Sequence, residues 1–240
     1  MRKHAYWLTG LLLLAGCATT SHAVPGKSEP TQAADASLPP SAQSDLYLGV
    51  VDGLIRQQRY EAAIAFLAQY QKSQAPTPRY HKLVGDALAG AGRTEEALAA
   101  YRLALKSDFA AQAYNGIGRT LSVSGKWEEA AANFRQAATL DPSNAGYLNN
   151  FGYAQLKQNF RGSELAPVVN ELERAHELDP SSILIRDNLA LALALAGDHD
   201  RFIAFLNTIT DAGGRQRIAD FAVKWNPGWT GDTGIEKETP

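Results

Sequence analysis

Few side chains in this sequence combine the types and the spacing that catalysis or metal binding requires. The most suggestive cluster is Asp198-His199-Asp200, whose groups could ligate a metal. It follows Gly197 between two expected helices, where an Asp serves as an N-cap. The sequence has no nucleophile elbow, no HExxH motif, no phosphate-binding glycine loop and no Cys-His pair. We therefore predict that the protein is not an enzyme and uses no metal or cofactor. An enzyme whose site forms only on folding is the alternative.

The residue with the clearest chemistry is Cys17. It is the only Cys among 240 residues, so it cannot form an internal disulfide. A basic start, Arg2-Lys3-His4, precedes an apolar stretch over residues 5–14 and then the run Leu14-Ala15-Gly16-Cys17. A stretch of that length covers about 15 Å as a helix, roughly half of the hydrocarbon core of a bilayer. It is too short to span a membrane and is typical of a secretory signal.

The run that ends at Cys17 resembles the lipobox of bacterial lipoproteins. The resemblance implies that residues 1–16 are removed as a signal peptide and that Cys17 is lipidated on its thiol and on its new amino group. Three acyl chains would hold a membrane far more firmly than one. Ala18 is not the Asp that retains enteric lipoproteins at the inner membrane. The implied location is therefore the outer membrane, lipid-anchored and facing the periplasm, with an ordinary signal peptide and a chance Cys as the alternative.

The charge and the segment after Cys17 define the class of partner. The formal net charge is −2 and the pI is about 6.2, so no overall positive field favours nucleic acid. Residues 17–43 are rich in Pro, Ser, Ala, Thr and Gln and have no apolar periodicity. This composition predicts a disordered tether with a span of roughly 30 Å. We expect protein partners and a membrane anchor, without nucleic acid or a small-molecule substrate.

From Ser44 onward the chain has helical periodicity and an internal repeat. Three short segments align, and their last residues, Ala63, Ala97 and Ala130, are 34 and 33 residues apart. This period and its residue pattern resemble the tetratricopeptide repeat, a helix-turn-helix unit. The third unit, from Ala111, matches best, through Tyr114, Ile117, Gly118, Leu121, Ala130, Phe134, Ala137 and Pro142. The resemblance implies an all-α fold, a TPR α-solenoid in which helix-turn-helix hairpins form a right-handed superhelix.

The repeat register divides the chain. We expect about five hairpins over residues 44–211, a capping helix over 212–227 and a flexible tail over 228–240. Small residues such as Gly85, Gly118 and Gly152 should let the second helix of each hairpin approach closely. The fourth unit is longer than the others, with its surplus within residues 156–167, and this leaves its local packing open.

The first helix of each unit lines the concave face in this repeat family, where extended or helical peptides bind. Positions five and nine of those helices predict a partner groove formed by Lys82, Asp86, Asn115, Arg119, Asn149 and Tyr153. Asn can hydrogen-bond a peptide backbone as donor and acceptor, and Lys or Arg can pair with a carboxylate. Ordinary solvated residues on a groove wall are the alternative at each position. Trp225 and Trp229 are a second candidate interface, unless they pack on the last hairpin.

Two segments resemble a narrower family. The run Tyr147-Leu148-Asn149-Asn150-Phe151-Gly152-Tyr153-Ala154 and the Asn-Leu-Ala-Leu-Ala tract within residues 185–194 are similar to the TadD family of tetratricopeptide lipoproteins in the tight-adherence (Flp pilus) secretion system. The resemblance implies a pilotin-like scaffold for the outer-membrane secretin. The alternatives are adaptors of type IV pilus secretins, of peptidoglycan hydrolases or of polysaccharide export.

Overall fold

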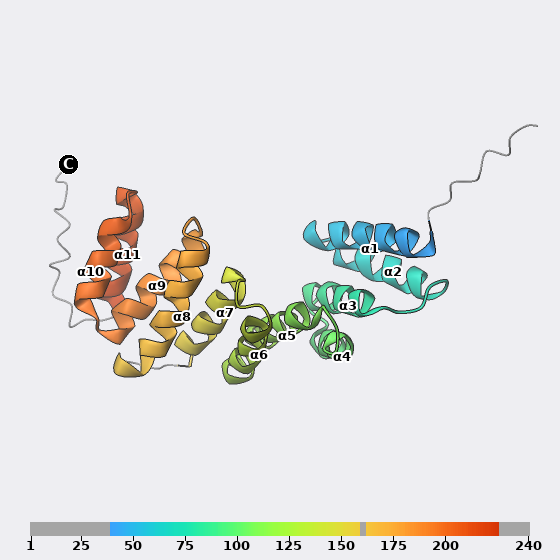
Figure 1. Ribbon diagram of the computed structural model, residues 1–240, viewed down its shortest axis with the longest axis horizontal. Coiled ribbons are helices and arrows are strands. Elements are labelled where there is room, and N and C mark those ends of the chain that lie inside the picture. Colours follow the sequence, from blue (N-terminus) through green and yellow to red (C-terminus); the bar gives the residue numbers. More distant parts are fainter. Residues whose placement is uncertain (1–38, 159–161, 226–240) are drawn as a thin grey trace, which may run out of the picture. The chain divides into compact units, whose positions relative to one another are not determined.

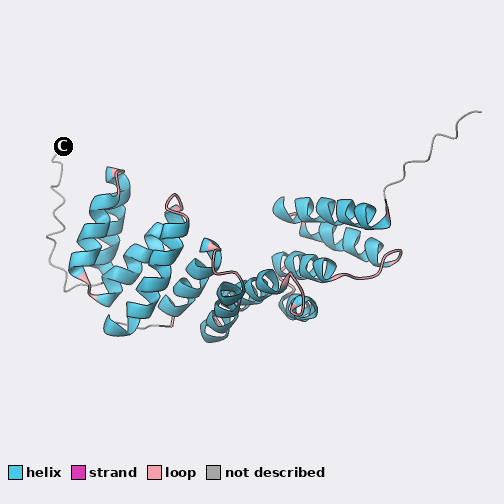
Figure 2. Cartoon of the chain, in the orientation of Figure 1, coloured by secondary structure: helices cyan, strands magenta, loops and turns pink. Residues whose placement is uncertain are grey.

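The computed structural model describes residues 39–158 and 162–225, and these residues form helices joined by short turns, with no strand among them (Figure 2). The prediction of an all-helical repeat fold is confirmed. Cys17, the signal segment 1–16, the tether up to residue 38, Trp229 and the tail 228–240 lie outside the described residues. No helix in the described ranges is long and apolar enough to cross a bilayer.

The helices follow one another in pairs (Figure 1). Each helix packs against its neighbour along the chain. The first helices of adjacent pairs also contact each other; for example, α1 contacts α3, and α3 contacts α5. In chain order the elements are α1 (Pro40–Arg56), α2 (Tyr60–Gln71), α3 (Pro78–Gly90), α4 (Thr94–Ala104), α5 (Ala110–Val123), α6 (Trp127–Leu140), α7 (Ala145–Leu156), the 3-10 turn η1 (Gly162–Leu165), α8 (Ala166–Leu178), α9 (Ile183–Ala196), α10 (His199–Thr208) and α11 (Ala212–Trp225).

The turn between the two helices of a pair needs one left-handed residue. Gly92, Gly125 and Gly197 have φ of +77°, +73° and +74° at this place. In the first pair the same place is taken by Gln58, with φ of +59°. Because only Gly adopts this conformation without steric cost, the turn at Gln58 is strained and the turns at Gly92, Gly125 and Gly197 are not.

Helix pairs close tightly through glycines that face large side chains, as the repeat pattern predicts. A Cβ added to Gly85 would lie 2.5 Å from the ring of Tyr101, and one added to Gly118 would lie 2.6 Å from the ring of Phe134. At Gly152 the nearest atom would be Cγ of Leu172, at 2.7 Å. Each glycine therefore makes room for one buried side chain of the second helix.

One boundary differs from the sequence-based expectation, and the surplus of the fourth repeat lies where the sequence placed it. Helix α1 begins at Pro40 rather than at Ser44, because Pro at the first helical position loses no hydrogen bond and has its φ already fixed. The surplus of the fourth repeat contains η1, which places the fully buried Leu165 between α7 and α8. The insertion thus adds to the core.

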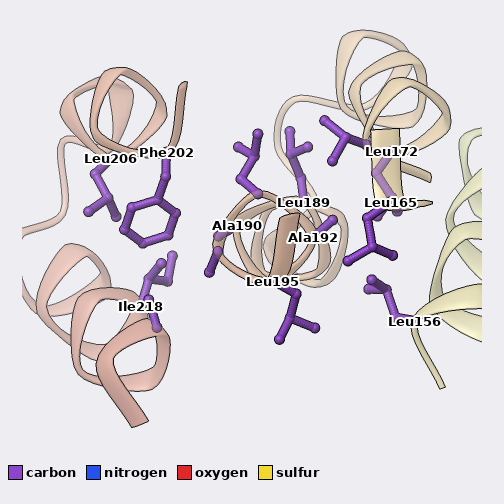
Figure 3. Packing of buried hydrophobic residues seen from close by; sticks show 14 of the residues in the cluster. Leu156, Leu165, Leu172, Leu189, Ala190, Ala192, Leu195, Phe202, Leu206 and Ile218 are labelled. Carbon is purple, nitrogen blue, oxygen red and sulfur yellow. The ribbon is translucent and has the colours of Figure 1, made fainter. Parts of the chain in front are cut away.

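The C-terminal core is organised around α9 (Figure 3). Phe202 and Leu206 of α10 and Ile218 of α11 pack on one side of it. Leu165 and Leu172 lie on the other side. Helix α11 contacts α9 and α10, in the position expected of a cap.

Candidate partner groove

A groove of about 570 Å³ lies along the first helices of the first three pairs. Most of its lining comes from α1, α3 and α5, and α2, α4 and Tyr147 of α7 also contribute. The lining mixes charged, amide and hydroxyl groups with a few apolar side chains, among them Ile55 and Val123. Val123 is 88% exposed. Such a surface offers polar anchors and apolar contact to an extended chain.

Four of the six residues named from the sequence line this groove. They are Lys82 and Asp86 of α3 and Asn115 and Arg119 of α5. The first helix contributes Asp52 and Arg56, which we did not name from the sequence. Asp52 precedes Asp86 by one 34-residue period, so the repeat register itself was the signal that could have found it.

The Asp86 side chain is held in place on the groove floor by two partners. Its Oδ1 accepts a hydrogen bond from the Tyr101 hydroxyl at 2.8 Å, and its Oδ2 pairs with Nζ of Lys82 at 2.7 Å. Both carboxylate oxygens are therefore held, and the Lys82 charge is balanced within the protein. This network orients the floor but leaves neither charge free for a partner.

Tyr101 is a groove residue that the sequence pattern did not reveal. Its position in the repeat is a core position, and the side chain is only 2% exposed. Gly116 leaves the space that its ring occupies, so the hydroxyl reaches the groove and Asp86. Burial and the neighbouring Asp86 carboxylate raise the pKa of Tyr101 well above its ordinary value. The phenol therefore stays protonated and remains a hydrogen-bond donor.

Arg119 is the positively charged residue of the groove lining that forms no ion pair among the described residues. The side chains of Lys82 and Arg56 pair with Asp86 and Asp52, the latter pair at 2.8 Å. Within residues 39–158 and 162–225 no carboxylate forms an ion pair with the exposed Arg119. Its charge still acts locally, because it opposes the rise in the pKa of Tyr101. A carboxylate or carbonyl oxygen entering the groove would find this guanidinium available.

Asn149 is not part of the groove lining. It is 3% exposed, and its Oδ1 accepts a hydrogen bond of 2.8 Å from Nδ2 of Asn188 on α9. One repeat earlier, Nδ2 of Asn150 donates to Oδ1 of Asn115 at 2.9 Å. These bonds link successive first helices, so the role of Asn149 is to join repeats.

Tyr153 also lies away from the groove lining. Its ring meets Trp127 edge-on, with the centroids 5.9 Å apart. Nζ of Lys157 lies 5.4 Å from the centre of the same Trp127 ring. Tyr153 thus packs on the first residue of α6, away from the groove lining.

The triplet Asp198-His199-Asp200 has a structural position. The side chain of Asp198 accepts a hydrogen bond from the backbone N of Arg201, which makes it the N-cap of α10, as the sequence predicts. In the described part of the chain, no group of three or more His, Cys, Asp or Glu side chains is placed to hold a metal ion. Trp225, of the second candidate interface, is the last residue of α11.

Comparison with known proteins agrees with this architecture. A tetratricopeptide-repeat family model matches residues 48–116, and a TPR-repeat model matches residues 118–159. The TPR repeat-containing protein PA4299 of Pseudomonas aeruginosa is 27% identical over 188 residues, which are 78% of this chain and 71% of that protein.

Solved structures share the fold at low sequence identity. A structure of PilF from Pseudomonas aeruginosa is 19% identical, with a TM-score of 0.57, and the match covers 78% of this chain and 94% of that one. MamA from Desulfovibrio magneticus RS-1, residue 41 to its end, is 17% identical with a TM-score of 0.54, covering 78% and 97%. The repeat is typically a protein-interaction scaffold and not an enzyme. Sequence pattern, helix pairing and these matches together make the chain a tetratricopeptide-repeat protein.

Proposed function

We propose that the protein is a scaffold that holds an extended segment of a partner protein in the groove formed by α1, α3 and α5. The observation that carries the proposal is the unpaired guanidinium of Arg119 above a floor whose other charges are already balanced. Asn115 keeps its amide nitrogen for a partner, because only its Oδ1 is used by Asn150. Arg119 and Asn115 together present donors to the carbonyl and carboxylate oxygens of a bound chain.

The setting of this scaffold follows from the N-terminal sequence. We propose that Cys17 is lipidated and that the protein is anchored in the outer membrane, facing the periplasm. The lipobox-like run before Cys17 and the Pro-rich segment that follows support an anchor and a tether. Cys17→Ser should release the protein from the membrane fraction without changing its helicity. Unchanged fractionation would exclude the lipid anchor.

The client that we propose is the Flp (tight-adherence) pilus machinery, with a pilotin-like role toward its secretin. The support is the similarity of residues 147–154 and 185–194 to TadD lipoproteins. Neighbouring genes for a secretin, a secretion ATPase and a small pilin would agree with this client. Neighbouring polysaccharide synthases would point instead to a scaffold for export of surface polysaccharide.

The groove is tested by a double variant, Asn115→Ala with Arg119→Glu. Pull-down from outer membranes should recover at least tenfold less secretin, because a repulsive charge replaces the free donor and about 1.4 kcal/mol corresponds to each factor of ten. Lys106→Glu is the matched control, since it reverses an exposed charge that is outside the groove lining. Equal recovery by both variants would mean that the partner binds elsewhere.

A further inference from the structure

The first helix presents an apolar face that the described chain leaves uncovered. Leu46 is 63% exposed and Val50 is 50% exposed. Gly49 and Gly53 lie on the same face, since residues three, four and seven positions apart in a helix are neighbours. A Cβ added to either glycine would meet nothing within 4 Å. The face is thus a stripe in which the side chains of Leu46 and Val50 alternate with glycines, which have no side chain.

The repeat register shows what this face is shaped to receive. Leu46, Val50 and Gly53 are the third, seventh and tenth residues of the first repeat. In the next three repeats the same positions are all buried or half-buried: Tyr80, Val84 and Ala87, then Ala113, Ile117 and Thr120, then Tyr147, Phe151 and Ala154.

In those repeats the face packs on the preceding pair of helices. The ring of Tyr80 stacks on Tyr70 of α2, with centroids 5.4 Å apart. Ile117 shares a cluster with Ala97 of α4. The equivalent face of α1 therefore has the form of a helix-packing surface without its helix.

The sequence next to α1 and the described helix at the far end of the array are both poor candidates for the missing helix. Residues 18–38 contain Pro25 and Pro30 and no apolar periodicity in their sequence. At the other end of the array, α11 exposes Arg217, Asp220 and Lys224. That charged surface is a poor match for an apolar stripe, so head-to-tail stacking of copies is disfavoured.

The stripe is complementary to itself when two copies run antiparallel. A two-fold axis midway between residues 49 and 50 places Leu46 opposite Gly53 of the second copy and Val50 opposite Gly49. Each large side chain then meets a glycine, which permits close approach of the two helices. The same register places Asp45 beside Arg56 of the second copy, so the flanking charges are opposite in sign; within one chain Asp45 also pairs with Arg79, and Arg56 with Asp52.

We infer that the protein forms a two-fold symmetric homodimer through antiparallel packing of α1 on α1 of a second copy. The groove stays open in this dimer, because Asp52 and Ile55 line it from another face of α1. Of the residues named for the dimer interface, Arg56 alone also lines the groove. Each assembly would carry two grooves and two anchors, which raises avidity for a ring-shaped or repeated client.

Disulfide trapping in intact membranes tests the dimer on the full chain. Val50→Cys places a thiol close to the two-fold axis and should give a disulfide-linked dimer on a non-reducing gel. Gln57→Cys is the register control, because residues 57 of the two copies would lie about 22 Å apart along the helices. Leu103→Cys is the control for random collision, because Leu103 on α4 is 63% exposed and Val50 is 50% exposed. The unaltered chain measures any background from Cys17.

The inference predicts that Val50→Cys crosslinks at least tenfold more than either control. Equal yields at the three sites, no dimer from Val50→Cys, or a disulfide to a different protein would overturn it. Val50→Glu supplies a second measurement: the detergent-solubilised chain should fall from dimer to monomer mass by light scattering, with unchanged helicity. A mass unaffected by Val50→Glu would equally overturn it.

Discussion

Gly118→Ala tests whether close packing of helix pairs holds the array together. The added methyl would lie 2.6, 2.7 and 3.0 Å from Cε1, Cδ1 and Cζ of Phe134. The ring is 3% exposed and packed in a cluster with Tyr101 and Ile117, so it has little room to move. Overpacking of this kind costs about 1–3 kcal/mol, against a gain of ~1 kcal/mol in helix propensity. We expect a net loss of up to ~2 kcal/mol.

The assay is urea denaturation followed by circular dichroism, with the midpoint and the slope both recorded. The cost of Gly118→Ala should shrink or change sign in the background of Phe134→Leu, because the smaller side chain frees the space. Gln136→Ala, at an exposed site on α6, is the control and should change stability by less than ~0.5 kcal/mol. A gain in stability from Gly118→Ala alone would refute the argument.

Three further predictions concern the turn, the groove floor and the Asn bonds. Gln58→Gly should increase the free energy of unfolding by ~1 kcal/mol, because it removes the left-handed strain that the glycine turns avoid. The gain should appear as a higher midpoint temperature in thermal denaturation. The pKa of Tyr101 is raised in the folded state, so its stabilising contribution is complete below the ordinary pKa of 10 and is lost as the pH rises above it. Tyr101→Phe should flatten that alkaline loss in pH-dependent denaturation. Asn188→Ala should cost ~1–3 kcal/mol in urea, since it leaves the buried Oδ1 of Asn149 without a donor, and replacing both residues by Leu should cost less.

Most of the fold could be predicted from the sequence because its signals are local. Glycine and aromatic residues recur at a fixed period, and each unit meets mainly its neighbours, so one repeat specifies the next. The facing pairs at Gly85, Gly118 and Gly152 follow directly from that register. The start of α1 at Pro40 was missed because a Pro-rich composition masked a proline that is favourable at a helix start.

The site could be predicted only in part, because position in a repeat does not fix what a side chain meets. Lys82 and Arg119 occupy register positions that face the groove, and the structure places them there. Asn149 has an equivalent position, but α9 covers it and Asn188 takes its carbonyl oxygen. Tyr101 entered the groove floor through the space left by Gly116, a contact between repeats that no local pattern records.

The most direct test of the scaffold claim is site-specific photocrosslinking in cells. A benzophenone amino acid at Asn115 or Arg119 should capture one partner protein in an adduct that is visible by mass. The same probe at Asn133 of α6, outside the groove lining, should capture at least tenfold less. Equal capture from the two sides, or capture only from residue 133, would contradict the assignment of the groove as the partner site.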